Sequence, residues 1–164
     1  MFSRRDFTFV ASGLAATLLA GRTARAAGSK SSATFEITKT EDEWKKVLTP
    51  DQFAVLRKHG TERAASSPLD KTYAAGTYSC AACDLPVYSS EAKFDSGTGW
   101  PSFTQPLENA IGTSEDNTLF STRTEVHCRR CGGHLCHVFK DGPAPAGLRY
   151  CMNGIALKFV PKTV

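Results

Sequence analysis

Cysteine and histidine are the side chains of this chain whose types and spacing could do chemistry, and most of them lie in its C-terminal third. Four of the six cysteines and three of the four histidines fall between residues 127 and 151. Thiolates and imidazoles bind zinc, and they also act as nucleophiles and proton donors. We therefore expect this segment to contribute both to a metal site and to a thiol active site.

The first pattern is a pair of C-x2-C motifs, Cys80–Cys83 and Cys128–Cys131, separated by 44 residues. Each motif can form a tight turn with both sulfurs on one side, and four thiolates complete the closed tetrahedral shell that structural zinc prefers. We predict one structural zinc ion per chain on these four cysteines, with Arg129 and Arg130 offsetting part of their negative charge. Iron accepts the same ligands and is an alternative.

Disulfide bonds are the other alternative for the cysteines. Their number is even, and the N-terminal segment described below predicts export to a place where thiols are oxidised. A disulfide within a C-x2-C motif, however, closes a very small loop and stabilises little. The two matched motifs therefore favour a metal over a disulfide scaffold.

Cys151 is the candidate nucleophile among the two remaining cysteines. On a β-strand, Arg149, Cys151 and Asn153 would share one face, because alternate side chains point the same way. An arginine and an amide beside a thiol supply a positive charge and a hydrogen-bond partner, which favour the reactive thiolate.

His134 and His137 are candidate acids, because imidazole titrates near neutral pH. They are three residues apart, so strict alternation along a strand would place them on opposite faces. We expect them to converge only if a bulge or bend interrupts this strand.

The loop of residues 96–103, Ser-Gly-Thr-Gly-Trp-Pro-Ser-Phe, could provide a wall for a small apolar group. Its two glycines permit unusual backbone angles, and Pro101 restricts the conformation of Trp100. The alternative is that Trp100 and Phe103 simply fill the core.

Two short amphipathic helices are expected before the β-rich part of the chain. Each begins with a threonine followed three residues later by Glu or Gln, which is the capping-box pattern. The expected features are a cap at Thr40 with Trp44, Val47 and Leu48 on one face, a cap at Thr49 with Phe53 and Leu56 on one face, and a helix end at Gly60 after His59.

Helical periodicity disappears after residue 75. Short runs bounded by Gly, Pro, Asn and Asp predict strands near residues 76–79, 85–88, 118–122 and 155–160. We therefore expect a mainly β, largely antiparallel domain.

The N-terminal segment has the features of an export signal. Arg4 and Arg5 precede an apolar run over residues 10–20, and residues 24–26, Ala-Arg-Ala, form a small-residue cleavage site. The paired arginines followed by an aromatic residue predict the twin-arginine route. An uncleaved anchor and an ordinary secretion signal are the alternatives, although the apolar run is short for a membrane span.

These features divide the chain into an export signal at 1–26, a flexible tether at 27–34 and one domain at 35–164. We expect the mature protein in the bacterial periplasm, without a membrane span after cleavage. The net charge of +4 falls to about +1 on cleavage, because residues 1–26 carry four arginines and one aspartate. The mature domain has no basic stripe, so we expect no nucleic-acid partner.

The chain resembles the B-type methionine-R-sulfoxide reductases over about residues 35–161. The matching segments are Gly60-Thr-Glu62, the two C-x2-C motifs, residues 93–103, Glu125-Val-His-Cys128, His134-Leu-x-His137-Val-Phe139, Asp141-Gly-Pro143, residues 147–153 and Ala156-Leu-Lys-Phe159.

The resemblance implies two antiparallel sheets with short N-terminal helices, a structural zinc on the four motif cysteines, and thiol-dependent reduction of the R epimer of methionine sulfoxide. Protein-bound methionine would be the main substrate and free methionine sulfoxide a second form. The expected partners are oxidised exported proteins, which the enzyme would repair, and a thioredoxin-like or other thiol reductant. We expect a monomer.

The same resemblance assigns roles to individual residues. Cys151 matches the nucleophile, which would pass through a sulfenic acid that a second thiol must reduce. The remaining matches are His134, His137 and Asn153 for the sulfoxide oxygen, Trp100 and Phe139 for the walls around the substrate methyl, and Asp141 with Arg149 for a pair that shapes the site.

The sequence departs from the family pattern at three positions. Thr98 stands where many members have a resolving cysteine, Cys136 stands where glycine is usual, and Gly154 stands where serine is usual. Cys136 is either a small buried apolar residue or the thiol that resolves the Cys151 sulfenic acid.

Three functions remain open at this point. They are a zinc-stabilised sulfoxide reductase, a zinc-binding β module that has lost turnover through the changes at Cys136 and Gly154, and a disulfide scaffold. The retained thiol, imidazoles and Trp100 favour the enzyme.

Overall fold

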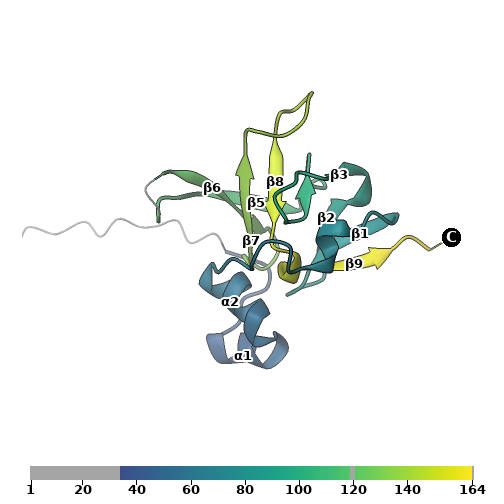
Figure 1. The fold of residues 1–164 in the computed structure, drawn as a ribbon. Coiled ribbons are helices and arrows are strands. Elements are labelled where there is room, and N and C mark those ends of the chain that lie inside the picture. The colour runs from purple at the N-terminus through teal and green to yellow at the C-terminus, as the bar shows by residue number, and fades with distance from the viewer. Residues whose placement is uncertain (1–33, 119–120, 164) are drawn as a thin grey trace, which may run out of the picture. The chain divides into compact units, whose positions relative to one another are not determined.

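In the part of the chain that the structure describes, the fold consists of two antiparallel sheets and two short α-helices that precede them, as the sequence predicts. A computed structural model describes residues 34–118 and 121–163 (Figure 1). The expected export signal (1–26) and the tether (27–34, apart from Thr34) lie outside the described residues. Among the residues that the structure does describe, no helix has the length and apolar character needed to cross a membrane.

The sheets have three and six strands. The small sheet has the order β2-β1-β9, and the large sheet has the order β3-β4-β8-β7-β6-β5. The strands are β1 (Gly76–Cys80), β2 (Pro86–Ser89), β3 (Lys93–Phe94), β4 (Ser102–Phe103), β5 (Ile111–Asp116), β6 (Arg123–Cys128), β7 (His134–Phe139), β8 (Arg149–Met152) and β9 (Leu157–Pro161).

Two of the four predicted strand positions are wrong in part or whole. Residues 118, 121 and 122 belong to the connection between β5 and β6, so the β-branched composition there does not mark a strand. Ile155 lies in η3 (Gly154–Ala156), a 3-10 turn, and β9 begins only at Leu157. The strands predicted near residues 76–79 and 85–88 are confirmed as β1 and β2.

Helices α1 (Glu41–Val47) and α2 (Pro50–Lys58) begin as expected. Thr40 and Thr49 accept hydrogen bonds from the backbone of Glu43 and Gln52, and both capping boxes are complete. Val47 was expected on the buried face, but it is 60% exposed. The buried stripe of α1 follows the i, i+4 spacing of Trp44 and Leu48, which leaves Val47 outside.

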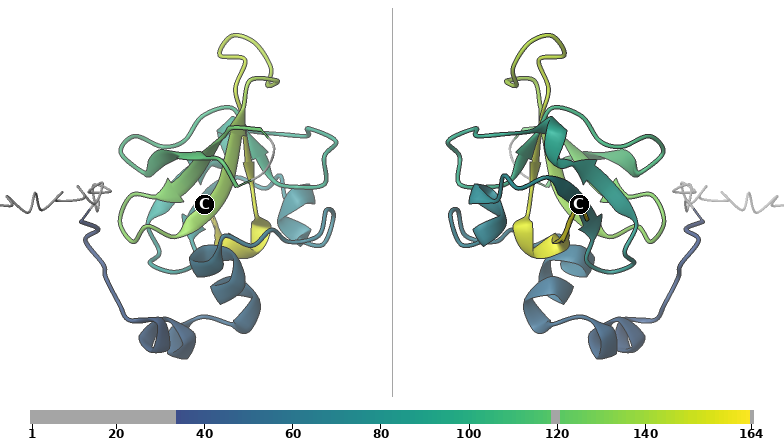
Figure 2. Two further views of the ribbon diagram at one scale, coloured as in Figure 1. Left: turned by 90° about the vertical axis from the view of Figure 1, so that its left-hand side faces the viewer. Right: turned by 90° about the vertical axis from the view of Figure 1, so that its right-hand side faces the viewer.

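The end of α2 differs from expectation in a way that matters for the site. His59, rather than Gly60, is the helix C-cap and adopts a left-handed conformation with φ 56°. In the views of Figures 1 and 2, α1 and α2 lie at one end of the sheets, and the β7–β8 connection projects at the opposite end. Strands β7 and β8 therefore run between the two ends.

The core between the sheets is aromatic. Tyr78, Tyr88 and Phe103 are fully buried, and the rings of Tyr88 and Phe103 stack with centroids 4.3 Å apart. Phe103 is thus a core residue, as the simpler alternative held. Trp100 is only half-buried, which leaves it available for another role.

Candidate active site and metal centre

The four motif cysteines converge as predicted. The sulfurs of Cys80, Cys83, Cys128 and Cys131 all lie within 4.8 Å of one another. The Cys80–Cys131 and Cys83–Cys128 sulfur pairs are 3.8 and 3.5 Å apart. Four sulfurs at about 2.3 Å from a zinc ion in a tetrahedron are about 3.8 Å from one another. The geometry therefore fits a closed tetrathiolate zinc site and not disulfides.

The arginine that contacts this centre is not one of the two predicted. Arg57 of α2 donates to the Cys131 sulfur at 3.3 Å and to the Cys131 carbonyl at 2.9 Å. Its guanidinium also lies 3.9 Å from the centre of the Trp44 ring. Arg129 instead pairs with Glu36, and Arg130 donates to the Cys83 carbonyl. Arg57 was missed because α2 and the second motif are far apart in sequence.

A β-bulge brings the two predicted histidines together. Between β6 and β7, Val126 pairs with Cys136 while His127 pairs with His134, so Leu135 is the extra residue. The bulge restores His134 and His137 to a common side, and their ring centroids lie 5.5 Å apart. The expected interruption of strand alternation is therefore confirmed.

Cys151 lies on β8 directly opposite His137 of β7, and Arg149 lies opposite Phe139. These pairs are two residues apart, so all four side chains share one face of the sheet. Cys151 is 5% exposed. Hydrogen bonding from the Cys136 thiol, the charge of Arg149 and the Thr98 hydroxyl together lower the pKa of Cys151 against the opposing effect of burial. The thiolate is thus favoured at this position.

His134 is held by a carboxylate that sequence reasoning did not assign to the site. Its Nδ1 lies 2.7 Å from Oε1 of Glu125, and Nδ1 of His59 lies 3.2 Å from the same oxygen. Ser114 donates to the other oxygen. Burial would raise the pKa of Glu125, but hydrogen bonds from the imidazoles and from Ser114 outweigh burial and hold this pKa far below its usual range.

The second ring nitrogen of His134 is free. Nε2 is buried and has no hydrogen-bond partner among the described residues. Because Glu125 fixes Nδ1, Nε2 is the atom that His134 can offer to a ligand.

His137 has the opposite arrangement. Its Nε2 lies 2.7 Å from Oδ2 of Asp116, which also accepts from Arg123 at 2.6 Å. Burial lowers the pKa of His137, and Asp116 opposes this shift. The neutral ring thus carries its proton on Nε2, and its Nδ1 lies 3.7 Å from the sulfur of Cys136.

Asn153 positions the tryptophan loop through backbone contacts. Its amide is fully buried, donates to the Leu135 carbonyl at 3.2 Å and accepts from the backbone of Glu62 at 3.0 Å. The Glu62 carbonyl in turn accepts from the Trp100 indole at 3.1 Å. Asn153 therefore holds the strand of the histidines and the anchor of Trp100 together.

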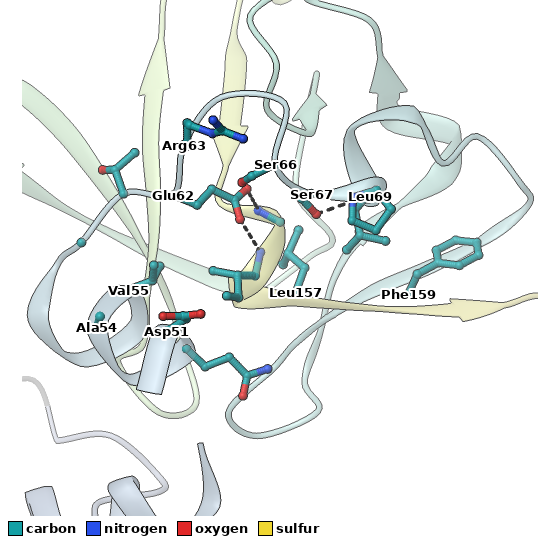
Figure 3. A pocket seen from close by; sticks show the side chains of 16 residues that line it. Asp51, Ala54, Val55, Glu62, Arg63, Ser66, Ser67, Leu69, Leu157 and Phe159 are labelled. Carbon is teal, nitrogen blue, oxygen red and sulfur yellow. Dashed lines mark hydrogen bonds between the residues drawn. The ribbon is translucent and has the colours of Figure 1, made fainter. Parts of the chain in front are cut away.

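The Glu62 carboxylate also caps the start of η3. It accepts from the backbone of Gly154 at 2.5 Å and of Ile155 at 3.0 Å (Figure 3). A groove of about 760 Å³ lies on this side, between α2, the 60–69 loop and β9. Cys151, His134, His137 and Trp100 are not among its lining residues, so it is separate from the sulfur chemistry.

Arg149 and Asp141 form the pair that the resemblance implies. Arg149 donates to both carboxylate oxygens of Asp141, at 2.9 and 2.8 Å. Its guanidinium lies 4.5 Å from the centre of the Phe139 ring, and the Phe139 and His137 rings are 6.4 Å apart. Phe139 is therefore beside the thiol site, which we define as Cys136, Cys151, His134, His137 and Arg149.

The change at Gly154 has a local explanation. A Cβ atom at this position would clash with the side chain of Ser67, whose hydroxyl accepts from the Leu69 backbone at 3.2 Å. Ser67 thus fills the space that a serine at position 154 would need. The glycine does not disturb the thiol site.

Comparisons with known proteins agree with this geometry. The profile of the SelR domain matches residues 48–161. The chain is 49% identical over 126 residues to a "peptide methionine sulfoxide reductase MsrB" of Leptospira interrogans, covering 76% of this chain and 96% of the relative. It is 52% identical over 124 residues to one of Methanosarcina barkeri (75% and 87%) and 50% identical over 129 residues to one of Pseudomonas syringae (78% and 98%).

Proposed function

This chain belongs to the SelR-domain family of B-type methionine sulfoxide reductases, and on that premise we propose that it reduces the R epimer through a sulfenic acid on Cys151. The observation that carries the proposal is the position of Cys151, opposite His137 and on one face with Arg149. A nucleophilic thiolate, an imidazole and a fixed cation thereby lie on one face of the sheet.

In the first step, the Cys151 thiolate attacks the sulfoxide sulfur while an imidazole protonates the sulfoxide oxygen. His134 is the acid in this proposal, because its Nε2 is free while Nδ1 is anchored on Glu125. The substrate sulfur gains two electrons and leaves as methionine. The Cys151 sulfur loses two electrons and, once the oxygen has passed to it, is a sulfenic acid.

The epimer would be selected by fixed walls and a fixed acid. Trp100 and Phe139 enclose the substrate methyl, and the Asn153–Glu62–Trp100 chain of hydrogen bonds holds one of these walls. Asn153 thus assists the oxygen chemistry by positioning, because its own amide is used by the backbone. The substrate methyl then lies between these two walls and the oxygen lies at the acid. Only one of the two configurations of the sulfoxide presents its sulfur to Cys151 in this position.

Zinc would be a structural component here. Four protein ligands leave no open coordination position, so the ion stabilises the fold and takes no part in turnover. The four-cysteine site joins the β1–β2 turn to the β6–β7 turn. The second turn leads into β7, the strand that contains both histidines.

The biological setting belongs to the same proposal. We place the mature enzyme as a monomer in the periplasm, where it repairs methionine-R-sulfoxide in exported proteins with electrons from a thiol reductant. Residues 1–26 support this through their paired arginines and short apolar run. Replacing Arg4 and Arg5 by lysine keeps the charge but should block export, and unchanged periplasmic recovery of the double variant would contradict the twin-arginine route.

Epimer-resolved turnover tests the enzymatic proposal. The purified zinc-containing protein is given a peptide with either methionine-R-sulfoxide or methionine-S-sulfoxide, with dithiothreitol as reductant. We expect methionine from the R peptide and background from the S peptide. Equal rates with both epimers, or reduction of the S epimer alone, would overturn the proposal.

A further inference from the structure

Cys136 is a second thiol beside the nucleophile. It precedes His137 on β7, is 6% exposed and pairs across the strands with Met152, the neighbour of Cys151. Cys136 and Cys151 are thus diagonal neighbours on adjacent strands. A strand spacing of about 4.8 Å and a rise of about 3.4 Å put their Cα atoms about 6 Å apart, within the range of about 4.4–6.8 Å that a disulfide bridges.

Strand alternation alone would put the Cys136 side chain on the face of its partner Met152, but its sulfur contacts His137 and Cys151 and so lies at the thiol site. Its sulfur lies 3.7 Å from Nδ1 of His137, the residue directly opposite Cys151. Its φ is 156°, at the edge of the range in which only glycine is unstrained, and it follows the bulge at Leu135. If residue 136 only filled space in the core, glycine would occupy the position without backbone strain. The strained cysteine therefore favours a chemical role for the thiol.

No other uncommitted cysteine is available to Cys151. Four of the six cysteines form the metal cluster, and Thr98 supplies a hydroxyl, not a thiol, beside Cys151. On the basis of the proposed function, we infer that Cys136 is the resolving cysteine, which closes a Cys136–Cys151 disulfide after each reduction of sulfoxide.

The step balances without a further reagent. The Cys136 sulfur, as thiolate, attacks the sulfur of the Cys151 sulfenic acid; an S–S bond forms and the S–O bond breaks. The thiol proton passes to Nδ1 of His137, which is the free acceptor because Nε2 is bonded to Asp116. The leaving hydroxide takes up this proton from Nδ1 of His137 and departs as water.

The charge on Cys151 would set the order of events. Hydrogen bonding to the Cys151 sulfur and burial raise the pKa of the Cys136 thiol, while the same contact lowers the pKa of Cys151. Before the reaction, therefore, Cys151 is the thiolate and Cys136 stays protonated. Formation of the neutral sulfenic acid removes the charge that opposes ionisation of Cys136, so the second thiol is released for attack only when it is needed.

The resolving step also defines the class of reductant. A disulfide is reduced by exchange with a dithiol, whose second thiol releases the mixed disulfide. A dithiol protein would therefore be the electron donor, and a monothiol would be slow with the oxidised enzyme.

Single turnover of the wild-type protein tests the inference. The reduced, zinc-containing enzyme is mixed with excess methionine-R-sulfoxide peptide and no reductant, quenched in acid, alkylated and digested for mass spectrometry. We expect one methionine per chain and a peptide in which Cys136 and Cys151 are joined. A free Cys136 beside an oxidised Cys151, or Cys151 joined to a different cysteine, would overturn the assignment while leaving the proposed function intact; absence of methionine would overturn both.

A variant that lacks the Cys136 thiol is the matched control for this experiment. Cys136→Gly relieves the backbone strain, and zinc content verifies its fold. In the same experiment it should form methionine more slowly, because the hydrogen bond that favours the Cys151 thiolate is lost, and Cys151 should be recovered as a sulfenic acid captured by a dimedone-type reagent. If the variant gives no captured sulfenic acid and Cys151 is instead found in another disulfide, Cys136 is not required for resolution.

Discussion

Nδ1 of His134 lies 2.7 Å from the Glu125 carboxylate, while Nε2 of the same ring is buried and has no hydrogen-bond partner within residues 34–118 and 121–163. This arrangement gives the imidazole one anchored nitrogen and one nitrogen free for substrate. It depends on the bulge at Leu135, without which His134 would face away from His137. Glu125 is thus a positioning residue that acts through His134.

Replacing Glu125 by glutamine should lower kcat more than it raises KM. The amide keeps the shape but removes the negative charge that offsets the doubly protonated ring, so proton donation from Nε2 weakens. We expect kcat to fall by about 10- to 100-fold, below the full contribution of an acid catalyst. Ser114→Ala is the matched control, because Ser114 contacts only the other oxygen of Glu125. Equal losses in both variants would show a merely structural role.

His59 should make stability depend on pH. The hydrogen bond to Glu125 raises the pKa of His59 above its unfolded value. Its stabilising effect is therefore complete below about pH 6.5 and is lost as pH rises through the higher folded pKa. Because the side chain is 66% exposed, the gain over His59→Asn should stay below about 1 kcal/mol. Urea unfolding at several pH values measures it, and a gain that grows above pH 8 would contradict this ionisation.

Loss of the metal should destabilise the fold. Arg57 should contribute more than Arg129 to the affinity for zinc. The Arg57 guanidinium donates to the Cys131 sulfur, so Arg57→Met should weaken zinc affinity by about 10- to 100-fold. Arg129→Met is the control, since Arg129 pairs with Glu36 and not with a sulfur. Competition with a chromogenic chelator gives both affinities. Equal affinities in the two variants would show that the Arg57 contact is without effect.

Gly154→Ser should destabilise this protein although serine is common there in the family. The new side chain would clash with Ser67, at a cost of about 1–3 kcal/mol. Adding Ser67→Gly should recover most of this loss, because it vacates the same space. Denaturant unfolding of the single and double variants measures both effects, and additive losses would contradict the proposed exchange of side chains between positions 67 and 154.

Local patterns were sufficient to name the metal ligands and the candidate nucleophile. Both C-x2-C motifs lie in tight turns, and Arg149 and Cys151 share a strand face, so short-range spacing defines them. The capping boxes at Thr40 and Thr49 are equally local. The contacts that depend on the packing of α2 were missed, because α2 must dock on the large sheet before Arg57 reaches Cys131 or His59 reaches Glu125.

The proximity of Cys136 to Cys151 also could not be predicted from the sequence, although the two residues lie on neighbouring strands. Both thiols could be named from the sequence, but their distance depends on the register of β7 with β8 and on a bulge in β7. A register shift of one residue would move Cys136 away from Cys151. Sequence alone therefore leaves the filler and the resolving roles open.

Turnover by Cys151→Ser tests the central claim most directly. The variant changes one sulfur to oxygen, and its zinc content and unfolding midpoint verify that the fold is intact. With methionine-R-sulfoxide peptide and dithiothreitol, we expect its rate to fall by more than about 1,000-fold relative to wild type. A variant that keeps the wild-type rate would show that Cys151 is not the nucleophile and would contradict the account.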